Sequence, residues 1–358
     1  MKISYLVLAG LATALGVGSA AGAQANGGAK APAPATSGAK PAAQATAPLK
    51  MNSLDPTSKA DPFPPVNPKF FTATTPTVDT VNSFLKSLWG YDANRIWRVE
   101  AILATPAQGV SKVVVSVAAR TPNAKVQSTA FFVLPDGMHA VAGDGVVPFG
   151  AAPFADIRKL LQERADGATR GAASKDFMLV EFADLQCPHC KEAQATVDQL
   201  AKDFPNARIV FQSFPLVELH PFAFKAAAYG VCITKQKNDS FYPYVNAVFD
   251  TQAALTPETG DQTLKDAVTK AGLDPATIDS CAATQATKDA VDASVKLAQD
   301  AGVEQTPTLA VNGHLLPLTG IPYETLKTIV AYQATLDGVS SGAGPALGFK
   351  VPSLLGKP

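Results

Sequence analysis

The stretch that most constrains this chain runs from Phe177 to Ala193, with the sequence FMLVEFADLQCPHCKEA. Its first half is an apolar, strand-like run, and its second half places Cys187 and Cys190 two residues apart at the start of a predicted helix. The unpaired N–H groups and the positive dipole end of a helix N-terminus favour an anion. Since the thiolate is the reactive form of cysteine, this position selects Cys187 as the nucleophile. Cys190, one turn further into the helix, is then the resolving thiol.

The two residues between these cysteines fit the same interpretation. Pro188 suits the first helical turn, where its missing N–H is no loss. His189 adds a donor or a positive charge beside the thiolate, which lowers the thiol pKa. The spacing therefore favours a redox-active dithiol, with half of a zinc site and an inert disulfide as the alternatives. A four-cysteine zinc site needs a second close pair, and the other two cysteines lie far apart in the sequence.

This stretch and the chain after it resemble the thioredoxin-fold disulfide oxidoreductases of the DsbA type, whose active-site tetrapeptide is Cys-Pro-His-Cys. The resemblance covers about residues 175–338. Glu181, in the strand before the tetrapeptide, matches the buried acid beneath the family's active site, with a solvated strand-end acid as the alternative. Thr306-Pro307 matches the family's cis X-Pro that faces the dithiol, and X-Pro is the bond at which cis costs little. Such a bend leaves the Thr306 backbone available to a substrate strand; an ordinary strand-entry proline is the alternative.

The resemblance implies an α/β, thioredoxin-like fold over residues 177–338, with an inserted α-helical subdomain over about 219–300. Cys232 and Cys281 both fall within this insertion. In an exported protein we interpret such an even pair as a structural disulfide. Two free buried thiols, or a second redox pair that relays electrons from Cys190, are the alternatives.

The N-terminus has the features of an export signal. Residues 1–23 comprise a lysine, an apolar run and a small-x-small cleavage site at Ala21-Gly22-Ala23. An uncleaved anchor is the alternative, because the run is nearly long enough to span a bilayer. Export implies an oxidising location, the periplasm or the cell exterior. Residues 24–66, rich in alanine and proline, are expected to form a disordered spacer.

Residues 67–150 are predicted to form a small α+β domain. A helical period covers 77–89, strand-like segments follow, and Asp136-Gly137 marks a hairpin turn. This order resembles the N-terminal dimerisation domain of the DsbC and DsbG disulfide isomerases. Residues 151–176 are predicted to be a linker, made of an amphipathic helix and a flexible stretch rich in glycine and alanine. Residues 339–358 are predicted to be a loose tail.

The overall charge argues against some functions. The chain carries 30 basic and 30 acidic residues and has no basic block, so neither nucleic acid nor a membrane surface is expected as a partner. Dithiol exchange needs no metal or organic cofactor. The resemblance implies partners of two kinds, exported proteins with thiols that are unfolded or partly folded, and a membrane redox partner like DsbB, VKOR or DsbD.

Three functions remain open at this point. The first is an oxidase that introduces disulfides into exported proteins, which the tetrapeptide favours. The second is a dimeric isomerase or reductase of the DsbC/DsbG kind, which Thr306 and the extra N-terminal domain favour. The third is a binding or chaperone module that uses the thioredoxin fold only as a cleft.

Overall fold

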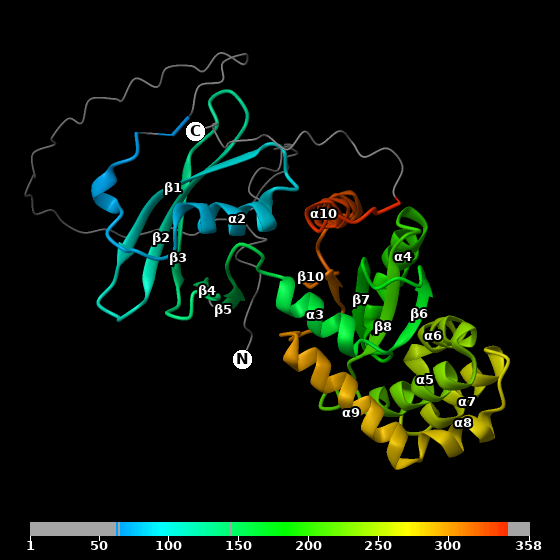
Figure 1. Ribbon diagram of the computed structural model, residues 1–358. Helices are drawn as coiled ribbons and strands as arrows, with labels where there is room; N and C mark the ends of the chain where they lie inside the picture. The colour runs from blue at the N-terminus through cyan, green and yellow to red at the C-terminus, as the bar shows by residue number, and fades with distance from the viewer. Residues whose placement is uncertain (1–61, 64, 144, 343–358) are drawn as a thin grey trace, which may run out of the picture. The chain divides into compact units, whose positions relative to one another are not determined.

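The structure, a computed structural model, describes residues 62–63, 65–143 and 145–342. The predicted export signal, nearly all of the spacer and most of the predicted tail lie outside these residues. The chain separates into two compact units (Figure 1). The first contains the described residues up to Val78 and the segment from Asn94 to Val147, and the second contains residues 79–93 and the chain from Pro148 onward.

The first unit is built on a five-stranded sheet in the order β1-β2-β3-β4-β5. The pairs β1–β2, β2–β3 and β3–β4 are antiparallel. The predicted hairpin turn joins β3 to β4, with Gly137 at a φ of 67° and Asp136 Oδ1 accepting from the N–H groups of Met138 and His139. The strands are β1 (Arg95–Ala104), β2 (Ser111–Ala119), β3 (Gln127–Val133), β4 (His139–Ala142) and β5 (Gly145–Pro148).

Helix α2 (Val78–Trp89) occupies the position where the sequence predicted a helix. It buries Val81, Phe84 and Leu85. The sequence grouped this helix with the strands that follow it, whereas in the structure residues 79–93 pack with the second unit. One physical reason is a long-range hydrogen bond, because the hydroxyl of Tyr332 donates to the Lys86 carbonyl at 3.0 Å.

The second unit contains a five-stranded sheet in the order β10-β9-β7-β8-β6. β7 and β8 are parallel and are connected through helix α4, while β9 is antiparallel to β7, β10 to β9, and β6 to β8. All six residues of β7 are buried, as expected for a central strand that is covered on both faces. The elements are β6 (Ala168–Gly171), β7 (Met178–Ala183), α4 (Pro188–Asp203), β8 (Arg208–Ser213), β9 (Thr308–Val311), β10 (His314–Pro317) and α10 (Tyr323–Leu336).

The segment before β7 differs in part from the prediction. Helix α3 (Ala155–Arg164) is present, but the glycine-rich stretch that follows it is the edge strand β6 and not a flexible linker. Its glycines allow close packing against β8. A Cβ on Gly167 would collide with the Phe211 carbonyl, and one on Gly171 with the Ala207 carbonyl. Local composition therefore indicated flexibility where the fold uses small residues for close backbone approach.

A helical insertion separates β8 from β9, and α5 to α8 lie together beyond the β6 edge of the sheet (Figure 1). This arrangement confirms the predicted thioredoxin-like fold with an inserted α-helical subdomain. Among the described residues, no helix combines the length and apolarity needed to cross a membrane. The insertion comprises α5 (Ala223–Lys237), η2 (Asn238–Ser240), α6 (Phe241–Asp250), η3 (Gln252–Ala254), α7 (Gly260–Lys270), α8 (Pro275–Ala282) and α9 (Gln285–Asp300).

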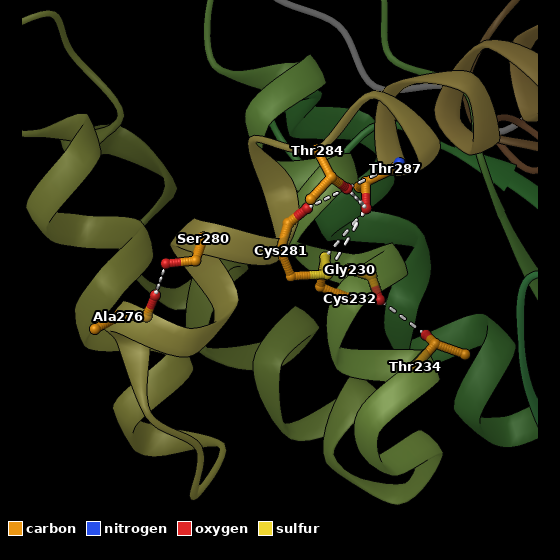
Figure 2. The surroundings of a disulfide bond; sticks show 8 residues. All are labelled: Gly230, Cys232, Thr234, Ala276, Ser280, Cys281, Thr284 and Thr287. Atoms are coloured by element: carbon orange, nitrogen blue, oxygen red, sulfur yellow. Dashed lines mark hydrogen bonds between the residues drawn. A yellow bond between two sulfur atoms is a disulfide. The ribbon is translucent and has the colours of Figure 1, made fainter.

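Within the insertion, a disulfide joins Cys232 of α5 to Cys281 of α8 (Figure 2). The hydroxyl of Thr287, in the first turn of α9, lies 3.5 Å from the Cys232 sulfur and 3.7 Å from the Cys281 sulfur. Thr284 caps that helix by accepting from the Thr287 N–H. The disulfide therefore fixes α5 and α8 at the point where α9 begins.

Candidate active site

The two active-site cysteines lie at the start of α4. Cys187 is the N-cap residue and Pro188 occupies the first helical turn, as predicted. The Cys187 carbonyl accepts from the N–H groups of Cys190, at 3.1 Å, and Lys191, at 3.3 Å. Both thiols are unpaired in the structure. Cys187 keeps 5% of its surface exposed and Cys190 keeps none, so only Cys187 is accessible from outside.

The segment before β9 faces this dithiol. The Thr306–Pro307 peptide bond is cis. The Cys187 thiol donates to the Thr306 carbonyl, with 3.8 Å between sulfur and oxygen. Within the described part of the chain, the buried Thr306 hydroxyl has no conventional hydrogen-bond partner. Two segments more than a hundred residues apart thus meet at one sulfur atom.

The two thiols differ strongly in acidity. The pKa of Cys187 is lowered to about 5, first by a hydrogen bond from the Cys190 thiol and then by the Thr306 side chain and the backbone N–H groups of Cys190 and His189. Partial burial of Cys187 opposes this shift. Burial and the neighbouring Cys187 raise the pKa of Cys190 far above its ordinary value. The pair therefore combines a thiolate that forms readily with a thiol that stays protonated.

His189 lies at the surface, where its imidazole contacts Glu192. Its Nδ1 atom is 3.1 Å from Glu192 Oε2, and both side chains are about two-thirds exposed, at 65% and 70%. The pKa of His189 is raised, mainly by the hydrogen bond and charge of Glu192. The sequence predicted that His189 adds a hydrogen-bond donor or a charge beside the thiolate. In the structure, the backbone N–H of His189 donates to Cys187, while the imidazole contacts Glu192.

Glu181 lies in the central strand β7 and is fully buried, so the alternative of a solvated strand-end acid is wrong. Gln194 of α4 donates to its Oε1 atom at 2.8 Å and also lies 3.4 Å from the Cys190 carbonyl. The second oxygen, Oε2, is buried and unpartnered in the described chain. Burial raises the pKa of Glu181 to about 7, against the opposing effects of the Gln194 hydrogen bond and the Arg170 charge. An acid with this pKa can give or take a proton near neutrality.

Asp184 is a structural residue of the site that the sequence did not single out. Its buried carboxylate accepts from the backbone N–H groups of Gln186, at 2.7 Å, and Leu216, at 2.8 Å, and lies 2.8 Å from His220 Nδ1. Its own N–H donates to the Cys190 sulfur at 3.4 Å. His220 therefore helps to hold the loop before the dithiol. An aspartate directly after a buried strand was the available signal.

Gln252, in η3, connects the helical insertion to the same loop. Its side-chain amide donates to the carbonyls of Leu185, at 3.0 Å, and Cys187, at 3.1 Å. In the opposite direction, the Gln186 amide donates to the Leu255 carbonyl at 3.0 Å. These bonds fix the backbone of the nucleophile against the insertion. No local pattern identifies Gln252, because its partners lie more than sixty residues earlier in the chain.

Comparison with known proteins gives a family match over the second unit. Residues 164–336 match the family model described as thioredoxin. The chain is 28% identical over 158 residues, 41% of its length and 72% of the relative, to the "probable disulfide bond formation protein D" of Bacillus cereus. It is 31% identical over 147 residues to the Na(+)/H(+) antiporter NhaA 1 of Mycolicibacterium vanbaalenii. This aligned region is 40% of this chain and 23% of the antiporter. The chain spans only 9% of the length of a further antiporter relative, from Salinispora arenicola.

Solved structures of similar proteins cover about half of the chain. A periplasmic thioredoxin-like protein from Salmonella enterica serovar Typhimurium is 21% identical, with a TM-score of 0.43 over 50% of this chain and 96% of that one. Oxidised BdbD from Bacillus subtilis is 20% identical, with a TM-score of 0.42 over 47% of this chain and 93% of BdbD.

Four features fall in the same part of the chain. They are the family match, the Cys-Pro-His-Cys tetrapeptide at a helix start, the cis-proline beside it and the helical insertion. Residues 164–336 are a thioredoxin-fold domain that resembles the DsbA type.

Proposed function

We propose that this chain is an exported thiol:disulfide oxidoreductase that exchanges disulfides with secreted proteins and acts mainly as an oxidase. The observation that carries the proposal is the contrast between the two thiols. Cys187 is partly accessible and has a pKa of about 5, whereas Cys190 is buried and stays protonated. Stabilising the Cys187 thiolate favours the reduced enzyme, which makes the disulfide form a stronger oxidant.

The exchange proceeds in two steps. A substrate thiolate attacks the Cys187 sulfur of the Cys187–Cys190 disulfide, so a mixed disulfide forms and Cys190 leaves as a thiolate that takes up a proton. A second substrate thiolate then attacks the substrate sulfur of the mixed disulfide, and Cys187 leaves as a thiolate. Two electrons pass from the substrate dithiol to the enzyme, and the substrate gains one disulfide.

Glu181 serves the proton transfer of the first step. Cys190 has a high pKa and no exposed surface, so its leaving thiolate needs an internal proton donor. Glu181 has a pKa of about 7. It is linked to the Cys190 backbone through Gln194, whose side-chain amide donates both to Glu181 Oε1 and to the Cys190 carbonyl. It gives the proton, directly or through a water, and takes it back when the dithiol is reoxidised.

The proposal also names the substrates and the redox partner. The Thr306 backbone, held beside Cys187 by the cis bond to Pro307, pairs with an extended segment of the substrate protein. Substrates are exported proteins with free thiols that are unfolded or partly folded. A membrane oxidant like DsbB or VKOR regenerates the disulfide. The Bacillus cereus relative, whose name refers to disulfide bond formation, supports this direction of electron flow.

A second candidate function is a dimeric disulfide isomerase or reductase, kept reduced by a DsbD-like partner. Two observations favour it, the five-stranded sheet of the first unit, which offers a separate domain for dimerisation, and Thr306 before the cis-proline. A third candidate is a binding module without exchange chemistry. The low pKa of Cys187 weighs against that module, because a cleft used only for binding needs no activated thiol.

The equilibrium reduction potential of the Cys187–Cys190 pair, measured against glutathione, tests the proposal. We expect a value near the oxidising end of the range that this fold spans, roughly −270 to −120 mV. A value near the reducing end overturns the oxidase and favours the isomerase or reductase. Titration of free thiols before and after reductant tests the chemistry itself, since a binding module shows no exchangeable Cys187. The Cys187→Ser variant is the control.

A further inference from the structure

The second unit has a pocket of about 520 Å³ that no step of the proposed mechanism uses. It lies beside β6, where the chain passes from η2 into α6, and β6 and α6 are neighbours in Figure 1. Asn238 fixes one wall through paired hydrogen bonds with the Thr169 backbone, at 3.0 and 2.8 Å. We call this cavity, which is lined by Arg170, Arg208 and Tyr242 among others, the Arg170 pocket.

Arg170 uses only part of its hydrogen-bonding capacity. Its Nη1 atom donates to Asp198 of α4 at 2.7 Å, and its guanidinium lies over the Tyr242 ring, 4.3 Å from the ring centre. Its Nε and Nη2 atoms are buried and have no hydrogen-bond partner in the described structure. These two atoms form one edge of the guanidinium, and that edge binds oxyanions in a bidentate manner. A buried donor without a partner is costly and calls for an explanation such as a bound ion.

Arg208, on the neighbouring strand β8, gives the pocket a second cation. Its Nη1 atom donates to the Ala173 carbonyl at 3.2 Å, and its Nε atom is buried without a partner among the residues described. No carboxylate of the described chain forms an ion pair with it. Asp239 is the acidic residue that lines the pocket.

We propose that the Arg170 pocket binds a tetrahedral oxyanion, phosphate or sulfate, through the guanidinium of Arg208 and the free edge of Arg170, whose Nε and Nη2 atoms are covered by protein here and turn toward the anion when it binds. Three buried nitrogens lack partners, and a tetrahedral oxyanion offers more oxygens to them than the two of a carboxylate. The cavity volume falls within the range of small-molecule sites, about 300 to 1,000 Å³, so it also has room for the organic part of a phosphomonoester.

The pocket is electrostatically connected to the dithiol, and this consequence rests on the proposed function. The Arg170 charge lowers the proton affinity of Glu181, the buried acid beneath Cys190. An anion on Arg170 offsets part of that charge. Occupation of the pocket therefore favours protonated Glu181 and alters the proton transfer that accompanies exchange.

Direct binding tests the site independently of redox chemistry. Inorganic phosphate is titrated calorimetrically into the full mature chain and into its Cys187→Ser/Cys190→Ser variant, at constant ionic strength with chloride as the reference anion. Parallel titrations with sulfate and glycerol 3-phosphate distinguish a free ion from a phosphomonoester as the occupant. We expect saturable one-to-one binding of an oxyanion in both proteins and none of chloride.

Variants separate a built site from general charge attraction. Arg170→Lys keeps the charge and an ion pair with Asp198 but loses the two-nitrogen edge of the guanidinium. Arg208→Gln loses the second cation. Each is expected to weaken binding about tenfold or more, since hydrogen bonds to charged groups contribute about 1.5 to 3 kcal/mol. Asp239→Asn removes a like charge and is expected to strengthen binding severalfold. Arg164→Gln, which changes an exposed arginine paired with Asp300, is the matched control and is expected to have no effect.

Two outcomes overturn the site. One is the absence of saturable binding by any of the three oxyanions. The other is binding that Arg170→Lys and Arg208→Gln leave unchanged, which means an adventitious ion only. If binding holds but phosphate leaves the pH dependence of exchange unchanged, the site stands and its connection to Glu181 fails.

Discussion

Gln194 donates to one oxygen of the Glu181 carboxyl group at 2.8 Å, while the other oxygen is buried and has no partner in the described chain. One hydrogen bond does not compensate a buried carboxylate for its lost hydration, so the neutral acid is favoured and the pKa rises to about 7.

Glu181 therefore makes stability depend on pH. Its pKa is raised from 4.5 when unperturbed to about 7 in the fold, so the folded state binds the proton more tightly. The resulting contribution is fully present below pH 4.5 and is lost as the pH rises through 7. We expect the reduced protein to lose about 3 kcal/mol of unfolding free energy between pH 4.5 and 8 from this group. Urea unfolding of Glu181→Gln should lack this loss, and a parallel decline in both proteins would contradict it.

The acidity of Cys187 depends on Thr306. The pH dependence of iodoacetamide alkylation should show a midpoint near 5. The Thr306 hydroxyl has no partner while Cys187 is a thiol, but it can donate to the Cys187 thiolate. Thr306→Val removes this donor and is expected to raise the midpoint by up to about one pH unit, the effect of one hydrogen bond to a charged group. Thr308→Val, which removes a neighbouring hydroxyl that donates to the Gln305 carbonyl, is the control. An unchanged midpoint in Thr306→Val would show that Thr306 acts only through its backbone.

The imidazole of His189 should matter less than the Thr306 hydroxyl. His189→Ala removes the exposed contact with Glu192 but keeps the backbone N–H that stabilises the Cys187 thiolate. We expect the alkylation midpoint of Cys187 to rise by less than in Thr306→Val. An equal or larger rise would assign a direct role to the imidazole charge, as the sequence first indicated.

Removal of the Cys232–Cys281 disulfide should affect stability and not exchange. The bond closes a loop with a sequence separation of 49 residues. The double variant Cys232→Ser/Cys281→Ser is expected to lose about 3 to 4 kcal/mol of unfolding free energy in the chain-entropy model. Its Cys187–Cys190 pair should oxidise a model dithiol peptide at the unaltered rate. Loss of turnover in a folded double variant would instead indicate a second redox pair.

The sequence predicted the parts of the site that follow local rules. Cys187 was selected because a helix start stabilises an anion. Pro307 was selected because Thr306-Pro307 matches the cis X-Pro of the family that the chain resembles, and X-Pro is the bond at which cis costs little. Both lie where these rules place them, Cys187 as the N-cap of α4 and Pro307 after a cis bond.

The residues that hold the loop could not be found in this way. Asp184 meets His220, and Gln252 meets Cys187, only after the helical insertion has folded against the sheet. Hydrophobic period and turn composition describe neighbours along the chain and contain no information on such contacts. The glycines around β6 show the same limit, because composition alone does not distinguish a flexible residue from one that allows two backbones to approach.

The edges of the second sheet have a consequence under the proposed function, in which the substrates are unfolded or partly folded chains. Its two outer strands, β6 and β10, are only four residues long, and β10 ends in Pro317, which has no N–H to offer. Short edges and prolines discourage the addition of foreign strands, which would otherwise lead to aggregation. If the proposed substrates expose unpaired backbone, these edges let the second unit work among them without becoming a template for their misassembly.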